Sequence, residues 1–489
     1  MSSLSIPETK PHLPENWAWA KLGQVGTVAA GGTPSTKDKS NFDGDVPWVT
    51  PVDLSGFDEK FIRRGRRNLS EKGLQSSSAV LLPTGTVLFS SRAPIGYAAV
   101  AANPIATNQG FKNLIPDTGV ILSEYLYYYL KANKQLAVSY ASGTTFLEVS
   151  GSRFSQIPVP LPPLQEQHRI VAKVEGLITQ ADAGIQSLQK ARAQLREHRN
   201  SVLKAAFEGK LTERWRKAHR LDIKPVVLEQ GQTTKPLDAE NQVFQKELPD
   251  SWRWATVADI AESMKNGIYK PKSYYSDNGI ACLRMYNIEN GSVVWKNIKR
   301  MNLTAEEIRE YQLLPGDILV NRVNSRELVG KAARFPDGVE TCVFESKNIR
   351  LRTSRSGVDS KYVAFWFLIS GQQYFNRNAQ QVVGMASVNQ NQLGAMPIPL
   401  PSLAEQYAIA SRIGHIFSVA DETAALVVQS SSQAERLRQS IWKKAFRGEL
   451  VPQDPQDESA RILLERAKTR KGQMVIEKAG EERHRVNCG

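Results

Sequence analysis

Two acidic residues and a lysine in the second half of the sequence have the spacing of a metal-dependent nuclease. Pro336-Asp337 followed by Glu345-Ser346-Lys347 fits the loose Pro-Asp…Glu-x-Lys pattern. In such a site the two carboxylates hold Mg²⁺ and the lysine positions the attacking water. The pattern is short and common by chance, and the corresponding stretch 103–112 of the first half contains no acid. We therefore favour a structural role, and keep a self-contained nuclease using Asp337, Glu345 and Lys347 as an alternative.

The rest of the sequence lacks the motifs of common enzyme classes. There is no Gly-x-x-x-x-Gly-Lys-Ser/Thr loop, and Asn103-Pro104 lacks the second proline and the aromatic residue with which amino-methyltransferases hold adenine. None of the six histidines has metal-ligand spacing to another. The cysteines Cys282, Cys342 and Cys488 are few and scattered, which argues against a zinc site or a disulfide framework. We expect no catalytic residue and no metal or cofactor bound by this chain.

What remains is binding to a polyanion. The chain has 63 Lys and Arg against 49 Asp and Glu, a formal net charge of +14, and such an excess favours nucleic acid. Reading DNA needs cations on phosphates and Arg, Lys, Asn or Gln at base edges. The candidate DNA-binding residues are Lys37, Arg63, Arg64, Arg66, Arg67, Arg92, Asn108, Gln109 and Arg153 in the first half, and Lys270, Lys272, Arg284, Arg322 and Arg326 in the second.

Composition also predicts where the protein acts. No apolar run reaches the roughly 18 residues that a membrane span needs. The segment Met1–Pro7 lacks the charged and apolar blocks of a signal peptide. With 41% hydrophobic residues the chain can form real cores. We expect a soluble, cytoplasmic protein of a reducing compartment.

The elements that would position these residues are repeated. The stretch Leu161–Leu211 recurs as Leu400–Leu450, so both ends are displaced by 239 residues and no insertion separates the copies. Pro162-Pro163 stands where a helix starts and Gly209 where a helix ends. Each copy therefore predicts one long helix, which would span roughly 70 Å at about 1.5 Å per residue. Such a helix is a spacer and does not form a pocket.

Both predicted helices carry apolar residues at alternating spacings of three and four, the pattern of a heptad seam. Two seams of equal length in one chain favour pairing of the helices with each other, although each could instead pack on its own domain. The predicted seam residues are Val174, Leu177, Leu188, Leu195 and Val202 in the first helix, and Ile413, Ile416, Val427, Leu437 and Ile441 in the second.

The globular regions repeat as well, but with less identity. The first region begins Leu13-Pro14-Glu15-Asn16-Trp17, and the second begins with the similar segment Leu248-Pro249-Asp250-Ser251-Trp252. We expect an α+β protein with irregular, mostly antiparallel sheets and strands at 87–89, 98–101, 318–320 and 341–344. The predicted domains are a globular region at 1–160, a helix at 161–211, a linker at 212–247, a second globular region at 248–399, a helix at 400–450 and a tail at 451–489. The tail carries a short amphipathic helix at 458–471.

Over nearly its whole length the sequence resembles a known family, the specificity subunits of type I restriction–modification systems. The carriers are Ile157–Gln167 and Ala205–Leu211 with their second copies, together with Trp17-Ala18-Trp19 and Gly31-Gly32-Thr33-Pro34. Ser402 is a small departure, since it stands for the second proline of the helix start. The resemblance implies that the globular regions are target recognition domains, each reading half of a bipartite DNA site. It also implies that the helices pair antiparallel with pseudo-two-fold symmetry and set the gap.

The resemblance further implies partners. Double-stranded DNA would be bound together with two methyltransferase (modification) subunits and with restriction subunits. The modification subunits would carry S-adenosylmethionine and methylate adenine after flipping it, while the restriction subunits would use ATP and Mg²⁺ for translocation and cleavage. The specificity subunit would be non-catalytic. The rival interpretations are a stand-alone DNA-binding protein and the self-contained nuclease.

Overall fold

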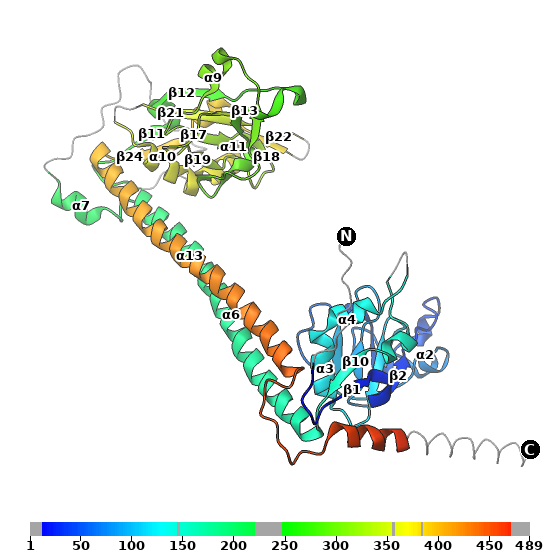
Figure 1. Cartoon of the computed structure of the whole chain (residues 1–489). Helices are drawn as coiled ribbons and strands as arrows, with labels where there is room; N and C mark the ends of the chain where they lie inside the picture. Colours follow the sequence, from blue (N-terminus) through cyan, green and yellow to red (C-terminus); the bar gives the residue numbers. More distant parts are fainter. Residues whose placement is uncertain (1–11, 144–146, 221–246, 355–356, 383–384, 471–489) are drawn as a thin grey trace, which may run out of the picture. The chain divides into compact units, whose positions relative to one another are not determined.

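The structure is a computed structural model that describes residues 12–143, 147–220, 247–354, 357–382 and 385–470. The chain divides into two compact units, Met1–Leu188 with Gln429–Gly489, and Gln189–Val428. Each unit contains one globular region and one half of each long helix (Figure 1). The division into six domains made from the sequence stays a prediction, and its segments 1–11, 221–246 and 471–489 lie outside the described residues.

The first unit is built on a five-stranded sheet. Its strands follow the order β2 (Gly26–Ala30), β9 (Lys112–Pro116), β6 (Val87–Phe89), β7 (Ala98–Ala101) and β5 (Phe61–Ile62). All neighbours are antiparallel except β5 and β7, which run parallel. Two further pairs are β1 (Ala18–Lys21) with β10 (Pro158–Leu161), and β4 (Trp48–Val49) with β8 (Ala106–Thr107). The strands predicted at 87–89 and 98–101 are confirmed.

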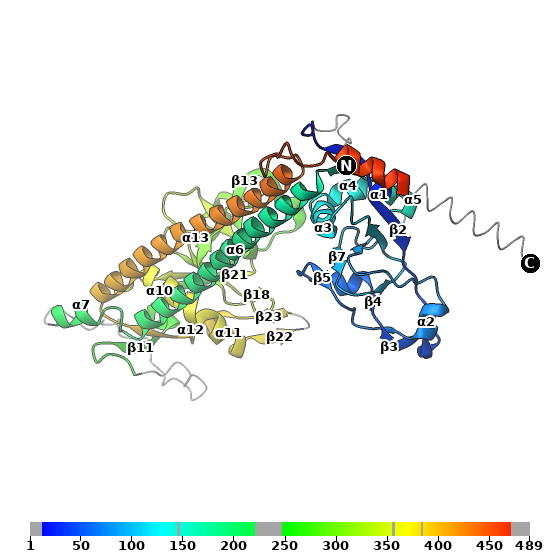
Figure 2. The same cartoon turned by 90° about the horizontal axis from the view of Figure 1, so that it is seen from below.

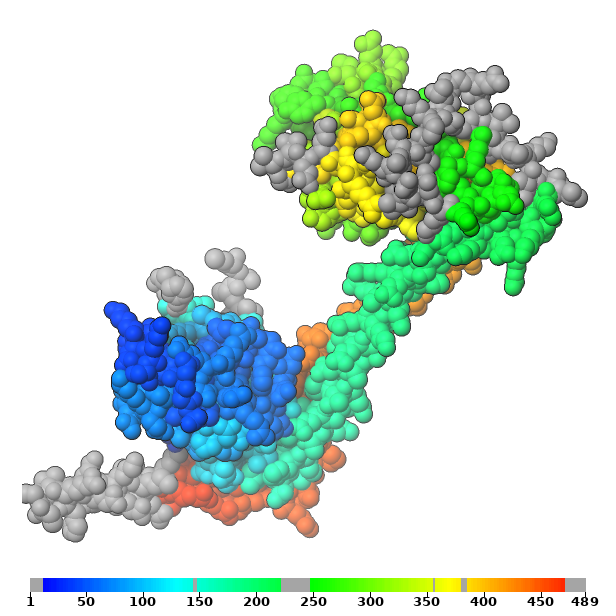
Figure 3. Space-filling view, turned by 180° about the vertical axis from the view of Figure 1, so that it is seen from behind, coloured from blue at the N-terminus to red at the C-terminus, as the bar shows by residue number. Residues whose placement is uncertain are grey.

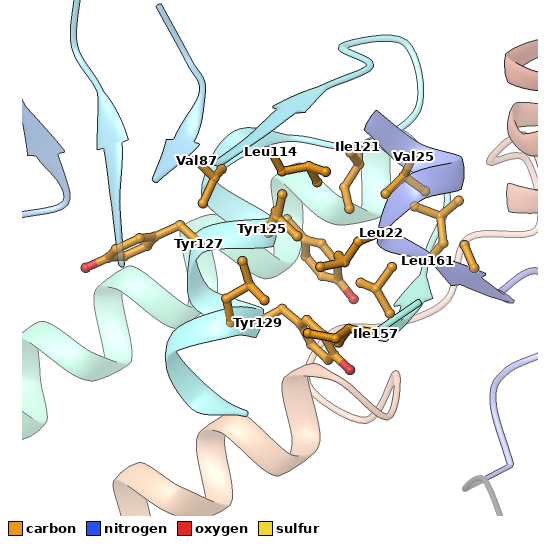
Figure 4. Packing of buried hydrophobic residues seen from close by; sticks show 14 of the residues in the cluster. Leu22, Val25, Val87, Leu114, Ile121, Tyr125, Tyr127, Tyr129, Ile157 and Leu161 are labelled. Carbon is orange, nitrogen blue, oxygen red and sulfur yellow. The ribbon is translucent and has the colours of Figure 1, made fainter. Parts of the chain in front are cut away.

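A tyrosine-rich helix covers this sheet. The helix α3 (Ser123–Ala132) buries Tyr125 and Tyr129 in the core (Figure 4), where the Tyr125 hydroxyl donates to the Pro160 carbonyl at 2.8 Å. The Tyr129 hydroxyl donates likewise to the Pro158 carbonyl, so α3 holds β10 through two hydrogen bonds. Burial raises the pKa of Tyr125 well above its ordinary value. The sequence around α3 thus fixes the strand from which the first long helix departs.

The second unit repeats this plan with its sheet broken into smaller pieces. The largest sheet has the order β12 (Ala261–Asn266), β21 (Asn348–Thr353), β17 (Ile318–Asn321) and β19 (Ala332–Arg334), all antiparallel. Beside it lie β16 (Lys299–Met301), β13 (Tyr275–Leu283) and β20 (Cys342–Phe344), and separately β18 (Val323–Asn324), β23 (Met385–Ser387) and β22 (Gln380–Val382). The strands predicted at 318–320 and 341–344 are confirmed, as is the α+β class.

The same anchors recur in this unit. The strand β11 (Arg253–Thr256) pairs antiparallel with β24 (Pro397–Leu400), as β1 pairs with β10. Helix α10 (Ser360–Trp366) holds β24, because the Tyr362 hydroxyl donates to the Pro399 carbonyl at 2.6 Å and the Trp366 indole donates to the Pro397 carbonyl at 2.8 Å. Tyr362 and Trp366 therefore do in the second unit what Tyr125 and Tyr129 do in the first.

Both predicted long helices form, but they are shorter than the predicted ranges 161–211 and 400–450, because Leu161 and Leu400 still belong to the preceding strands. Helix α6 spans Leu164–Phe207 and α13 spans Leu403–Ala445, and they lie side by side in both views (Figures 1 and 2). In the first unit the N-terminal half of α6 packs beside the C-terminal half of α13, and in the second unit the opposite halves meet. The pairing is therefore antiparallel. Described residues of the linker add the short helix α7 (Glu213–Ala218).

The seam is apolar within each unit. Val174 and Ile441 are buried in the core of the first unit, and Val202 and Ile413 in that of the second. Val427 is buried as well. The remaining predicted seam residues Leu177, Leu188, Leu195 and Ile416 are half-buried.

One seam position needs correction. Leu437 is 57% exposed, and its neighbour Arg438 is the half-buried residue of that turn. The Arg438 guanidinium lies 3.5 Å from the Asp182 carboxylate on α6. A seam with spacings of three and four residues can be continued through either position 437 or position 438. In the structure Arg438, which faces a carboxylate on α6, occupies the seam in place of Leu437.

Each long helix begins on one globular region and ends in the core of the other. The Trp17 indole donates to the buried Glu166 near the start of α6, and the Trp252 indole donates to the buried Glu405 near the start of α13, both at 2.9 Å. Phe207, at the end of α6, packs in the core of the second unit. The end of α13 packs instead in the core of the first unit. Within each unit, therefore, a helix start and a helix end clamp one globular region.

The turn after each helix fits against the entry of a globular region. At Gly209 a Cβ would lie 2.4 Å from Pro249, and at Gly448 it would lie 2.3 Å from Pro14. Both glycines have positive φ, near +73°, so no other residue suits these positions.

The predicted tail helix is present from 460 to 470, and residue 471 lies outside the described residues. It packs along the first globular region (Figure 3), where Ala460, Leu463 and Ala467 join the core.

Candidate nucleic-acid interface

Three loops meet beside the strand ends of the first globular region. The Asn108 amide donates to the Val49 carbonyl at 3.0 Å, and the Gly32 amide donates to the Thr107 carbonyl at 2.8 Å. We call residues 31–33, 49–53 and 107–110 the first loop cluster. A Cβ on Gly31 would lie 2.0 Å from the Asn108 carbonyl, so the loops can approach this closely only at glycine.

The second globular region builds the same arrangement. The Glu345 amide donates to the Leu283 carbonyl at 3.0 Å, and the Ile268 amide donates to the Phe344 carbonyl at 2.9 Å. Gly267 stands in the position of Gly31, since its Cβ would lie 2.2 Å from the Glu345 carbonyl. We call residues 267–269, 283–287 and 344–347 the second loop cluster.

The matching hydrogen bonds align the clusters residue by residue. The pairs of equivalent positions that carry different side chains include Thr33 and Tyr269, Val52 and Tyr286, Asn108 and Glu345, and Gln109 and Ser346. One backbone framework is therefore used twice with different chemistry on its surface. Such loops on a rigid scaffold are where binding residues are usually found.

Each cluster contains a short 3-10 helix, in which the side chain of the third residue accepts a hydrogen bond from the backbone amide of the residue before the helix. In η2 (Pro51–Leu54) the Asp53 carboxylate accepts from the Thr50 amide, and it also accepts from the Arg66 amide at 2.9 Å. In η5 (Met285–Asn287) the Asn287 side chain accepts from the Arg284 amide and donates to the Lys296 carbonyl at 3.0 Å. In both regions the capping side chain thus ties a basic segment to the loop cluster.

Both clusters expose apolar side chains beside these basic segments. Val52 is 61% exposed and Tyr286 is 66% exposed, at equivalent positions. Tyr269 is 80% exposed. The Arg284 guanidinium lies 5.5 Å from the Tyr286 ring, in cation–π range.

The structure brings several first-half candidates to the first loop cluster. Asn108 and Gln109 belong to it, and Arg63, Arg64 and Arg66 lie in the exposed segment tied to η2. Within the described residues no side-chain partner is recorded for Arg63 or Arg64. These two cations are therefore available to a phosphate.

The other first-half candidates either bind groups of the same region or lie outside the first loop cluster. Arg67 pairs with Asp43 at 3.1 Å and stacks on Phe42. Arg92 lies 3.7 Å from Glu148, which also binds Lys112, and Arg153 donates to two backbone carbonyls. Lys37 is exposed in the loop that follows residues 31–33.

In the second half only some candidates face solvent. Lys272 is exposed beyond Tyr269, whereas Arg284, in the second loop cluster, is half-buried and donates to the Asn297 carbonyl at 3.3 Å. Lys270 is bound by the Glu307 carboxylate, whose hydrogen bond raises the pKa of the lysine. Arg322 donates to the carbonyls of Val388 and Ser346, so it supports the backbone of the second loop cluster. Arg326 donates to the Asn376 carbonyl.

The nuclease pattern does not assemble into a site. Asp337 pairs with Arg334 at 3.4 Å before β20, whereas Glu345 follows β20 and accepts from the Met285 amide at 2.8 Å. Among the described residues no group of three His, Cys, Asp or Glu could hold a metal ion. The strand thus separates the two carboxylates that would have to share one Mg²⁺.

The two cysteines within the described ranges are buried. Burial raises the pKa of both the Cys282 and the Cys342 thiol to about 12. They therefore stay protonated at neutral pH and are poor nucleophiles. Among the described helices, none is both long and apolar enough to cross a membrane.

A separate groove of about 860 Å³ lies in the second unit. It runs between the globular region and the start of α13, and Trp295, Arg334, Phe365, Leu368 and Tyr407 are among the residues that line it. Its walls are mainly apolar, and they are not part of the second loop cluster.

Comparison with known proteins decides the family. A family model described as the type I restriction modification DNA specificity domain matches residues 14–190 and again residues 249–432. The chain belongs to this family. Both copies of the repeat are matched separately, and each match contains one globular region with the first part of its helix. The specificity-subunit resemblance seen in the sequence is thereby confirmed.

Curated relatives of this specificity subunit carry the same description. The MjaIX specificity subunit of Methanocaldococcus jannaschii is 35% identical over 284 residues, which cover 57% of this chain and 60% of that protein. The StySPI specificity subunit of Salmonella potsdam is 25% identical over 90% of each chain. The EcoKI specificity subunit of Escherichia coli is 24% identical over 96% of this chain and 99% of its own length.

Solved structures share the fold. A chain from a study of complex assembly and conformational transition of the type I R-M system superposes with a TM-score of 0.66 at 19% identity, covering 90% of this chain and all of that one. The HsdS subunit from Thermoanaerobacter tengcongensis gives a TM-score of 0.53 at 20% identity, covering 91% of this chain and all of that one. At these identities the likeness shows the architecture alone.

Sequence reasoning missed the exposed apolar residues of the loop clusters. It searched for cations and amides, whereas Val52, Tyr269 and Tyr286 are exposed beside them. No local signal in the sequence could have found them, because the equivalence of the segments 49–53 and 283–287 follows from the strand pairings and the backbone hydrogen bonds of the structure.

Proposed function

We propose that this specificity subunit reads a bipartite DNA target, one half-site through each loop cluster, and that the paired helices set the gap between the half-sites. The observation that carries the proposal is the duplicated loop cluster. One hydrogen-bonded framework presents different side chains in the two regions, as two unlike half-sites require. Exposed arginines beside the first cluster and Arg284 in the second supply charge for phosphates.

The chemistry belongs to partner subunits in this proposal. Two methyltransferase subunits carry S-adenosylmethionine and methylate adenine, one at each half-site, and restriction subunits use ATP and Mg²⁺ to translocate and cut DNA. The chain itself is non-catalytic and acts in the cytoplasm with its partners. The dispersed Asp337 and Glu345, and the buried thiols of Cys282 and Cys342, support this division.

The proposal is tested by methylation sequencing of DNA from a host that expresses the chain with its methyltransferase subunits. We expect methylated adenines in one split motif with a fixed gap, absent when the chain is omitted. Methylation of a single uninterrupted motif, or methylation that does not depend on the chain, would contradict the proposal.

The role of the helices has its own test. Four residues inserted at equivalent points of α6 and α13 lengthen each helix by about 6 Å. We expect a gap longer by about one to two base pairs and unchanged half-sites. Seven-residue insertions, which preserve the heptad phase, provide the matched control. An unchanged gap in a stably assembled complex would show that the helices do not set it.

A further inference from the structure

The loop clusters present one apolar side chain at the same place in both regions. Val52 and Tyr286 each occupy the second residue of a capped 3-10 helix, and each is more than 60% exposed. Single exposed apolar residues are ordinary on protein surfaces. Here, however, two independent sequences expose one at the position that their hydrogen bonds make equivalent, which calls for a common role.

The charges around this position are those of a DNA-binding surface. The segment tied to η2 carries Arg63, Arg64 and Arg66, and the segment tied to η5 carries the exposed Lys296, with Arg284 inside the cluster. Cations of this kind rest on phosphates and set the position of the protein on the duplex. An apolar residue beside these cations then reaches the groove, where it can contact base edges.

We propose that Val52 and Tyr286 are matched base-contacting, specificity-determining residues, one for each half-site, with Tyr269 extending the contact in the second region. This inference rests on the proposed DNA-reading function. Neither residue is a cation or an amide, so their contribution is contact with base edges and not charge.

The two side chains differ in what they can select. Valine has no hydrogen-bonding side-chain group, and the base-edge feature that it recognises in the major groove is the C5-methyl of thymine. Tyrosine offers a ring face and a hydroxyl that can donate to an acceptor such as adenine N7 or thymine O4. The half-site of the first region should therefore contain a thymine whose methyl group matters, while the second half-site is read through a different contact.

The experiment uses the complex of the full chain with its methyltransferase subunits, and methylation sequencing as the readout of specificity. Val52→Ala should relax one base position in one half-site by about tenfold, and Tyr286→Ala one position in the other half-site by a similar factor. Val339→Ala serves as the control, because Val339 is 38% exposed but lies before β20, at the opposite end from Glu345. The control should leave the motif unchanged.

A second measurement isolates the methyl group. Deoxyuridine in place of thymine, at the position that Val52→Ala relaxes, should weaken DNA binding by the wild-type complex about fourfold. It should have no effect on the Val52→Ala complex. Equal losses for both complexes would overturn the assignment of Val52.

The conservative variants Val52→Thr and Tyr286→Phe decide the matter if an alanine variant fails to assemble. Both keep the shape of the side chain and should change preference at the same base position. An unchanged motif in all assembled variants would overturn this inference, while the wild-type split motif would still stand. Loss of the split motif in the wild-type complex would instead refute the proposed function itself.

Discussion

The two globular regions share a framework and differ where that framework meets solvent. Both hold three loops together by the same backbone hydrogen bonds and the same close glycine contact, at Gly31 and at Gly267. The first presents Thr33 and Val52, whereas the second presents Tyr269 and Tyr286 at the corresponding places. The comparison shows that the side chains on the surface differ between the two regions while the backbone framework beneath them is the same. The exposed loop residues therefore differ between the regions, while the contacts that hold each region on the helices are kept.

The largest expected effect comes from exchanging a whole region. Replacing residues 13–160 by the globular region of another specificity subunit should change one half-site completely and leave the other half-site and the gap unchanged. The reason is that the helix starts and ends that clamp the region remain in place. Methylation sequencing measures all three features in one experiment, and a change in both half-sites would break the comparison.

The clamps themselves can be compared next. Phe207 contacts Tyr362 and Trp366 in the second unit, and Phe446 contacts Tyr125 and Tyr129 in the first. Phe207→Ala and Phe446→Ala should each lower the free energy of unfolding by about 3–4 kcal/mol, because removal of a buried aromatic ring leaves a cavity.

Hydrogen exchange resolved by peptide shows where that loss falls. Phe207→Ala should raise exchange mainly in 248–399, and Phe446→Ala mainly in 13–160. Loss of protection in the region that carries the start of the mutated helix, rather than its end, would refute the crossed arrangement.

A smaller effect is expected at the ion pairs between the helices. Arg199 pairs with Asp421 in the second unit as Arg438 pairs with Asp182 in the first, and the members are displaced by the same 239 residues. Partly exposed pairs contribute roughly 0.5 kcal/mol. Arg199 also donates to the Phe417 carbonyl at 3.2 Å and stacks on its ring.

Arg199→Ala should therefore destabilise the protein more than Arg438→Ala does. Chemical denaturation of the two variants, with Arg436→Ala as an exposed control on α13, measures the difference. Equal losses would mean that the contacts to Phe417 add nothing.

The smallest effect concerns pH. Burial raises the pKa of Glu166 above its ordinary value, although the Trp17 and Gln453 hydrogen bonds oppose the shift. A raised pKa means that the folded state binds more protons than the unfolded state, so stability falls as pH rises from about 4.5 through the folded pKa.

Glu166→Gln removes this titration, so the variant should gain stability relative to wild type over that window. Thermal unfolding from pH 4 to pH 7 measures the difference between the two proteins. Parallel profiles would show that Glu166 does not contribute to the pH dependence.

Much of the scaffold was predictable, because helix periodicity and proline or glycine punctuation are local signals. The starts and ends of α6 and α13, and the strand at 87–89, follow from a few neighbouring residues. The register of the seam was less certain, since Leu437 and Arg438 both fit a spacing of three or four. Only the position of Asp182 on the other helix decides between them.

The surface was harder to predict. Whether a cation is free depends on acids far along the chain, as Glu307 shows by binding Lys270 and Asp43 by binding Arg67. The loop clusters unite three segments that are not neighbours in the sequence, so no local pattern reveals that Val52 and Tyr286 are equivalent. That equivalence follows only from the backbone hydrogen bonds.

The fit of Pro14 against Gly448 repeats the fit of Pro249 against Gly209. The junction between a helix end and a globular region thus occurs twice, at Gly209 with the region that follows in the sequence and at Gly448 with the region at the other end of the sequence. A polypeptide half as long, holding one module and one rod, would contain every surface needed to rebuild the whole by self-association.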